Sequence, residues 1–219
     1  MSEINGKNKI DPAAMFKFSY GLYVLTAKTG EKDNGCIINT AIQVTSSPLR
    51  MSIAVSKANY THDMIKSSGI FNISILSTSA PFKVFEHFGF QSGRDTDKFA
   101  DCENNSRTAN GLRYTPKHTN CVISGKVTET YDYETHTVFI AEITESIVLS
   151  DEPSVTYQYY FDNIKPKPQP KTADGSADDA NKKKGFVCII CNYVYEGESL
   201  PPDYICPICK HGVADFKPL

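Results

Sequence analysis

The sequence predicts a mainly β protein in two unequal parts, a barrel-sized domain and a small domain that a metal ion must stabilise. Six runs rich in β-branched and aromatic residues fall within the first 164 residues. A proline-rich polar stretch follows them, and two Cys-x-x-Cys pairs stand near the end of the chain. Six strands can close a barrel, whereas the last part has too few apolar residues for a core of its own.

The predicted strands are short, and several of them alternate polar with apolar residues, as half-buried strands do. We expect them at residues 20–27, 35–44, 49–55, 70–76, 121–131 and 137–149. Three short helices fit the gaps. Residues 11–18 open with Asp-Pro, residues 61–66 begin with a good N-cap, Thr61, and residues 80–88 form a weaker helix.

Residues 165–185 are expected to form a flexible linker. Pro166, Pro168 and Pro170 exclude a helix or an inner strand, and the residues after them offer almost nothing apolar to bury. Such a coil places its ends roughly 25 Å apart and reaches about 65 Å when extended. The predicted domains are therefore 1–164 and 186–219, with the linker between them.

The two Cys-x-x-Cys pairs predict a metal site. Cys188, Cys191, Cys206 and Cys209 supply four thiolates, and such a tetrahedral cage takes either zinc or a single iron. Fourteen residues separate the two pairs, a spacing that fits zinc ribbons and shortened rubredoxins equally well. Spacing alone leaves the choice of metal open.

Composition and charge exclude several classes of protein. The net charge is −3 for residues 1–164, +3 for 165–185 and −2 for 186–219, which gives no support to nucleic-acid binding. No run has the length needed to cross a bilayer and no signal peptide is evident, so a soluble, cytoplasmic protein is expected. Cys36, Cys102 and Cys121 show no pairing pattern and are expected to be inert thiols.

One segment of the first domain has the features of a phosphate site. Ser56, Lys57, Asn59, Tyr60 and Thr61 lie where a predicted strand leads into a helix N-terminus. Free backbone N–H groups, hydroxyls and an ammonium group would meet there. The alternative is an ordinary capped helix with a solvated Lys57, and the local residues favour that alternative.

The last 34 residues resemble rubredoxin. The segment from Cys191 to Tyr195, the segment from Pro202 to Cys209, and Phe216 match a pattern in which aromatic and aliphatic side chains pack around one redox-active iron. Two features depart from that pattern. Asn192 and Lys210 stand where rubredoxins place glycine, and Tyr204 replaces the usual tryptophan. The resemblance favours iron over zinc.

Residues 10–162 resemble the flavin reductase-like, FMN-binding split-barrel proteins. The motifs NGCIINTAIQVTSSP, SKANYTHDMI, SSGIFNISIL and FGFQSGRDTDKF occur in the order of that family. The resemblance implies a homodimer with FMN at its interface, which reverses the preference for a simple capped helix. The FMN contacts it implies are Asn39, Thr40 and Ala41 near the ring, Ser56, Lys57, Asn59, Tyr60 and Thr61 at the phosphate, and His87, Phe90 and Ser92.

Two further segments receive structural roles. Arg94 and Asp95, with Asp97 and Lys98, are expected to be a charge cluster that holds a loop. Residues 157–161 resemble the closing strand of the barrel, in which Tyr160 is expected to pack in the core, the alternative being a contact with FMN.

A flavin barrel joined to a rubredoxin domain resembles the high-molecular-weight rubredoxins, or NAD(P)H:rubredoxin oxidoreductases. That resemblance implies FMN, one iron, NAD(P)H as electron donor, and a downstream acceptor such as a flavo-diiron protein. The hydride chemistry belongs to the flavin, so no catalytic side chain is expected. Two alternatives stay open: a flavin or ferric reductase with a docking module, and a non-enzymatic zinc-ribbon protein.

Overall fold

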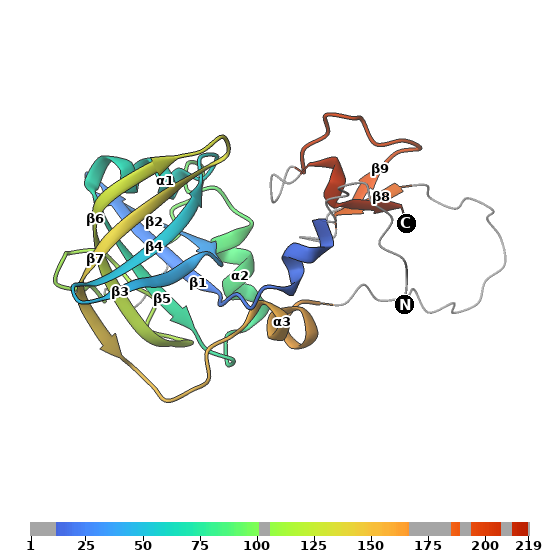
Figure 1. The fold of residues 1–219 in the computed structure, drawn as a ribbon. Coiled ribbons are helices and arrows are strands. Elements are labelled where there is room, and N and C mark those ends of the chain that lie inside the picture. The colour runs from blue at the N-terminus through green and yellow to red at the C-terminus, as the bar shows by residue number, and fades with distance from the viewer. Residues whose placement is uncertain (1–11, 101–105, 167–184, 189–193, 207–211, 219) are drawn as a thin grey trace, which may run out of the picture.

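The computed structural model describes residues 12–100, 106–166, 185–188, 194–206 and 212–218. Its larger part is one antiparallel sheet that curls into a barrel (Figure 1), with the strand order β2-β1-β5-β6-β7-β4-β3. The strands are β1 (Tyr23–Thr29), β2 (Lys32–Ile38), β3 (Ala41–Ser46), β4 (Leu49–Ser56), β5 (Ile70–Leu76), β6 (Thr119–Asp132) and β7 (His136–Val148). The prediction of a mainly β fold is confirmed.

One predicted strand, residues 35–44, is two strands. β2 ends at Ile38 and pairs with β1, whereas β3 begins at Ala41 and pairs with β4 at the opposite edge of the sheet. Thr40, between them, donates its hydroxyl to the carbonyl of Ala54 at 2.6 Å. The apolar run is continuous in the sequence, but the chain passes there from one sheet edge to the other.

The short helices lie close to the predicted positions. They are η1 (Pro12–Lys17, a 3-10 helix), α1 (Tyr60–Ser68) and α2 (Phe82–Gly89). In α1 the side chain of Asn59 caps the N-terminus, and Gly69 ends the helix with a left-handed φ of 70°. α1 packs against β1 and α2 against β2, so both lie on the barrel wall (Figure 1).

The closing strand expected at residues 157–161 is helical, so that prediction is wrong. α3 (Tyr157–Tyr159) continues into η2, a π-helix (Tyr160–Ile164). Thr156 caps the turn, because its hydroxyl accepts a hydrogen bond from the Tyr159 N–H at 3.1 Å. The aromatic residues in this segment also recur at helical spacing, a signal that their high strand propensity obscured.

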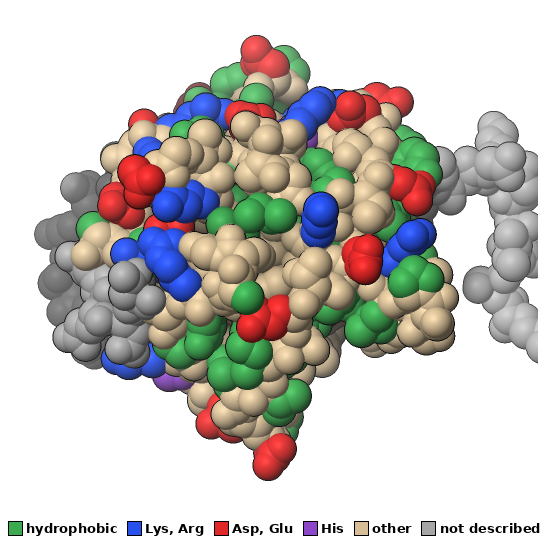
Figure 2. All heavy atoms as spheres, turned by 90° about the vertical axis from the view of Figure 1, so that its left-hand side faces the viewer, with side chains coloured by type: hydrophobic (Ala, Val, Ile, Leu, Met, Phe, Trp, Pro, Cys, Tyr) green, Lys and Arg blue, Asp and Glu red, His purple; other side chains and the backbone are tan. Residues whose placement is uncertain are grey.

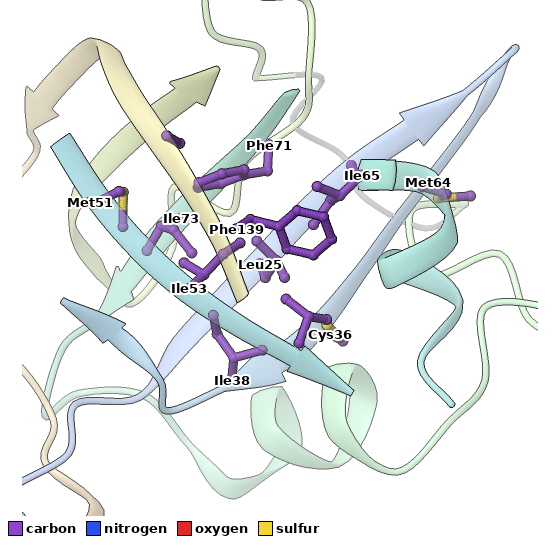
Figure 3. Close-up of a cluster of buried hydrophobic side chains, with 13 residues drawn as sticks. Leu25, Cys36, Ile38, Met51, Ile53, Met64, Ile65, Phe71, Ile73 and Phe139 are labelled. Atoms are coloured by element: carbon purple, nitrogen blue, oxygen red, sulfur yellow. The ribbon is translucent and has the colours of Figure 1, made fainter. Parts of the chain in front are cut away.

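Two apolar clusters form the core of the barrel domain. The first fills the barrel and includes Leu25, Ile53, Phe71 and Phe139, each at most 1 % exposed (Figure 3). The second lies between the barrel and α2, where Phe85 and Phe88 pack with Tyr160 and others. The second cluster joins the helical segment at residues 157–164 to the barrel.

The small domain is a three-stranded sheet in the order β10-β8-β9. Its strands are β8 (Gly185–Cys188), β9 (Val194–Glu196) and β10 (Phe216–Pro218), with a short 3-10 helix, η3 (Val213–Asp215), before β10. Phe216 pairs with Cys188 across two strands. Cys188, Cys206 and Phe216 are buried together with Phe186, Tyr195, Leu200 and Tyr204 against them.

The surface carries mixed charge. On the face shown in Figure 2, acidic and basic side chains are interspersed with small hydrophobic patches. Among the described residues, no helix is both long enough and apolar enough to cross a membrane.

Candidate functional site

A cavity of about 920 Å³ lies where several elements of the barrel domain end. Its walls come from the end of β2, the turn between β4 and α1, and α2 with the loop that follows it. The helical segment at residues 157–164, the tip of the β6–β7 hairpin, Leu22 and Gly212 complete it. The fold thus brings segments that are distant in the sequence around one space.

Seven of the eleven residues predicted to contact a cofactor line this cavity, and four do not. Those lining it are Asn39, Ser56, Lys57, Asn59, Tyr60, Phe90 and Ser92, and Tyr160 lines it as well. The four that do not line it are Thr40, Ala41, Thr61 and His87.

The four residues outside the lining have structural contacts. Thr40 holds the crossover between β2 and β3, and Ala41 packs against the main core. Nε2 of His87 lies 2.8 Å from the carbonyl oxygen of Lys98 and so braces the loop after α2. Thr61 is fully buried and accepts a hydrogen bond from the side-chain amide of Asn34 at 2.9 Å.

The turn between β4 and α1 satisfies most of its own backbone donors. The N–H of Thr61 bonds to the side chain of Asn59 at 3.2 Å, and the N–H of Asn59 bonds to the carbonyl of Ser56 at 3.0 Å. The N–H of Lys57 bonds to the carbonyl of Thr135 at 2.9 Å. The free N–H groups expected from the sequence are therefore largely engaged, and recognition of an anion at this turn depends on side chains.

The ammonium group of Lys57 already has partners. It donates to the carbonyl of Tyr133 and lies 3.5 Å from the carboxylate of Asp132. The hydroxyl of Thr137 and the nearby ammonium groups of Lys66 and Lys57 hold the pKa of Asp132 below its usual value. Asp132 is therefore charged at neutral pH and competes with any anion for Lys57.

A buried thiol and a buried amine lie on the inner side of the cavity. Burial raises the pKa of Cys36 and lowers that of Lys98 to about 8. The Lys98 ammonium donates to the carbonyls of Gly35 at 2.8 Å and Phe88 at 2.9 Å. These bonds join the loop after α2 to β2, and they give Lys98 a structural role.

The same loop is fixed to α1 by Arg94. Its guanidinium lies 2.7 Å from the carboxylate of Asp63 and 4.6 Å from the ring centre of Tyr60. Tyr60 is thereby held in place at the cavity wall by a cation–π contact. Arg94 therefore stabilises the shape of the cavity.

Much of the remaining lining of the cavity is aromatic, and the sequence pointed only to Phe90 and, as an alternative to core packing, to Tyr160. Phe85, Phe88, Tyr157 and Phe161 line the cavity along with Tyr160. The rings of Phe85 and Tyr160 are 4.6 Å apart, and those of Tyr160 and Phe161 are 5.4 Å apart. The available signal was the spacing of aromatic residues in two amphipathic helices, which is also the pattern of ordinary core packing.

The cavity suits a planar ring system with an anionic tail. Hydroxyl, amide and ammonium groups gather at the turn between β4 and α1, and aromatic rings gather around α2 and η2. A flavin mononucleotide has this same division between an apolar ring and a charged phosphate. The residues present therefore fit FMN, with Lys57 only partly available to it.

The structure describes two of the four predicted metal ligands. Cys188 and Cys206 are both 0 % exposed and pack beside Phe216, while Cys191 and Cys209 lie outside the described residues. The rings of Tyr195 and Tyr204 are 4.6 Å apart, and that of Tyr204 is 5.4 Å from Phe216. Two buried thiols next to an aromatic cluster fit a shielded thiolate–metal centre.

Two family models match different parts of the chain. Residues 15–167 match the family model described as flavin reductase like domain, and residues 186–217 match the rubrerythrin, rubredoxin-like domain. A high molecular weight rubredoxin from Moorella thermoacetica is 35% identical over 95% of this chain and 99% of its own length.

Two further proteins are similar to the barrel domain. A ferric-chelate reductase (NAD(P)H) from Archaeoglobus fulgidus is 35% identical over 75% of this chain and 96% of its own. The solved FMN-binding protein from Thermus thermophilus shares the fold, with a TM-score of 0.61 at 15% identity over 72% of this chain and 91% of that chain.

The chain belongs to the flavin reductase-like family, and a rubredoxin-like domain follows its flavin reductase-like domain. The resemblance to the high-molecular-weight rubredoxins predicted from the motifs is thereby confirmed, as is the split-barrel fold.

Proposed function

We propose that the protein is an NAD(P)H:rubredoxin oxidoreductase-type flavoprotein. Electrons pass from NAD(P)H through FMN to an iron held by Cys188, Cys191, Cys206 and Cys209, and on to an acceptor protein. The observation that supports this most is the presence of a flavin reductase-like and a rubredoxin-like domain on one chain. Zinc in the second domain would give the first one nothing to reduce.

The side chains of the cavity bind and orient; they do not react. Ser56, Lys57 and Asn59 hold the phosphate, and the aromatic end around Tyr160 holds the ring and excludes water from it. When bound, FMN would accept a hydride and release its electrons singly. An FeS4 centre passes electrons one at a time. Hydride transfer needs orientation and no general base, so we assign no catalytic residue.

Two observations support transfer within one chain. Gly212 of the small domain lines the cavity beside Tyr157 and Phe161. The pKa of Tyr157 is raised by burial and also by the negative charge of Asp215 in the small domain. Residues 165–185, proposed as the linker between domains 1–164 and 186–219, allow such an approach.

The proposed assembly is a homodimer. β3 is an edge strand of the sheet, and Ile42, Val44 and Leu49 on and beside it are exposed at 66%, 50% and 41%. An apolar edge strand of this kind is a natural pairing surface. The proposed downstream partner is a separate electron acceptor of the flavo-diiron type.

A second candidate function is ferric-chelate reduction. The relative from Archaeoglobus fulgidus that bears this name is similar to the barrel domain alone. In this case the small domain would serve only for docking, and iron chelates would accept electrons directly at the cavity.

One spectrum with metal analysis of the purified protein tests the proposal. We expect about one iron per chain and visible absorption from thiolate-to-iron charge transfer beside the flavin bands. NADH or NADPH should bleach both sets of bands. A colourless small domain that contains zinc would overturn the electron relay, and bleaching of the flavin bands alone would favour the ferric-chelate reductase.

A further inference from the structure

We propose that residues 212–215 of the small domain dock against Tyr157 at the wall of the cavity, and that the metal centre is reduced in this docked arrangement. The inference rests on the proposed function for the electron transfer itself, and it adds the surface through which the two domains meet. The docked partner is the small domain of the same chain.

The docking residues are firmly joined to the predicted metal centre. Gly212 comes three residues after Cys209 in the sequence, and η3 leads from Gly212 directly into Phe216. Phe216 pairs with Cys188 in the small sheet and packs beside Cys206. Because a short, structured path connects residues 212–215 to the cysteines, docking of these residues brings the metal centre to the cavity.

Gly212 already lies at the cavity in this structure. It lines the cavity together with Tyr157 and Phe161 of the helical segment. The ring of Tyr157 is fixed from the barrel side, since it packs edge-to-face on Phe161 at 4.9 Å and on Tyr20 at 6.1 Å. Tyr157 is therefore a rigid surface against which the small domain can rest.

Tyr157 and Asp215 are suited to a hydrogen bond across the two domains. Within the described ranges, neither the hydroxyl of Tyr157 nor the carboxylate of Asp215 has a hydrogen-bond partner. Burial and the negative charge of Asp215 raise the pKa of Tyr157, so its hydroxyl stays protonated at neutral pH. In the docked arrangement this hydroxyl donates to the carboxylate.

An apolar patch beside Tyr157 extends the docking surface. Phe18 and Met15 are 58% and 56% exposed, and the N–H of Phe18 bonds to the carbonyl of Met15 at 3.4 Å. The rings of Phe18 and Tyr20 are 5.7 Å apart, so the patch is continuous with Tyr157 through Tyr20. Grouped exposed apolar side chains mark interaction surfaces. The small domain is the occupant we assign, because its Gly212 already lies at the adjoining wall.

Such an interface is small and reversible. One hydrogen bond and a limited apolar patch give a weak contact, as is usual between electron-transfer partners. A weak contact lets the small domain leave the cavity and carry its electron to a separate acceptor.

The first experiment follows electron transfer in the full-length protein after rapid mixing with NADH or NADPH. Asp215→Asn should slow bleaching of the thiolate-to-iron band about tenfold, because losing one charge-assisted hydrogen bond lowers the docked population by that factor. Bleaching of the flavin bands should change less than about twofold, since hydride transfer takes place within the barrel domain. The matched control is Asp203→Asn, because Asp203 is an exposed carboxylate of the small domain that does not line the cavity.

The second experiment needs no electron transfer. It uses the full-length protein with zinc in the four-cysteine site, which gives sharp amide NMR signals. Tyr157→Leu should shift the amide signals of Gly212 and Asp215, because it removes the ring and hydroxyl they approach. Tyr159→Leu should not shift them, since Tyr159 lies on the same helical segment but outside the cavity lining.

Slower iron bleaching in Asp215→Asn alone, together with shifted signals in Tyr157→Leu alone, supports the docking surface. Equal slowing in Asp203→Asn, no slowing in Asp215→Asn, or unmoved signals of Gly212 and Asp215 in Tyr157→Leu would overturn it while the proposed relay stood. A wild-type iron band that never bleached would refute the relay, and the NMR shifts would still decide whether the domains dock.

Discussion

Lys57 shows how a residue chosen from a motif changes meaning when its neighbours are known. The motif predicts an ammonium group that is free for a phosphate, whereas the fold pairs it with Asp132 from the β6–β7 hairpin. Asp132 comes more than seventy residues later in the chain, so no local pattern could reveal the competition. The same hairpin also places His136 in the wall of the cavity.

Substitutions of Lys57 and of Asp132 should have opposite effects on the affinity for FMN. Lys57→Ala should weaken FMN binding by about 1.5 kcal/mol through the loss of a charge-assisted contact. Asp132→Asn should strengthen FMN binding, because it removes the competing carboxylate while the amide oxygen can still accept the hydrogen bond from Thr137. Flavin fluorescence titration measures both. Weaker binding by Asp132→Asn would show that Asp132 positions Lys57 and does not compete.

The lowered pKa of Lys98 predicts that the stability of the fold depends on pH. Burial lowers its pKa in the folded protein from the ordinary 10.5 to about 8, so between these values the unfolded chain holds a proton that the folded one has released. Stability from this group must therefore rise as the pH increases from 8 to 10.5. Denaturation of wild type and Lys98→Met across this range measures the difference, in which other groups common to both proteins largely cancel.

The predicted result is a free energy of unfolding that rises with pH more steeply in wild type than in Lys98→Met. Parallel curves would show that Lys98 titrates at the same pH in the folded and unfolded chains.

At the scale of elements, a buried ion cluster fixes a long loop to the barrel. Asp33 on β2 is 8% exposed and pairs with Arg107 at 2.7 Å and Arg113 at 3.0 Å. Asp33→Ala leaves two guanidinium groups without their carboxylate and should lower the free energy of unfolding by about 3 kcal/mol. Chemical denaturation followed by circular dichroism measures it.

The control is the pair of Lys28 and Glu31, which are 3.4 Å apart and whose carboxylate is fully exposed, whereas that of Asp33 is buried. Lys28→Ala should change stability by less than about 0.5 kcal/mol. Similar losses for Asp33→Ala and Lys28→Ala would contradict the role of burial in the cluster.

The sequence predicted elements well where local propensity and tertiary pairing agree. Residues 70–76 form β5 with the predicted bounds, and α1 lies at the predicted place, although Asn59 caps it and not Thr61. Residues 35–44 and 157–161 failed for one reason: composition favours a strand, whereas long-range pairing or helical packing decides the structure. The same limit applies to the cavity, because the motifs predicted its polar residues and Phe90 but not Phe85, Phe88, Tyr157 or Phe161.

At the scale of the whole molecule, we expect the small domain to depend on a metal. Cys188, Cys206 and Phe216 are the buried hydrophobic residues in the described part of residues 185–218, a core too small to be stable alone. Cys191→Ser should abolish or badly weaken iron binding and unfold residues 186–219, while the barrel stays folded with FMN. Metal analysis and amide NMR signals check this. Full iron content with ordered amide signals would refute the ligand assignment.

The central claim is that electrons cross from the cavity to the metal centre within one assembled molecule. Rapid mixing of the intact protein with NADH or NADPH, followed at the thiolate-to-iron absorption band over several protein dilutions, tests it most directly. If residues 165–185 act as the proposed linker, they keep the two domains at a high effective concentration, and the bleaching rate should not depend on protein concentration. A rate that fell in proportion to dilution would contradict transfer within the molecule, and a band that never bleached would refute the relay.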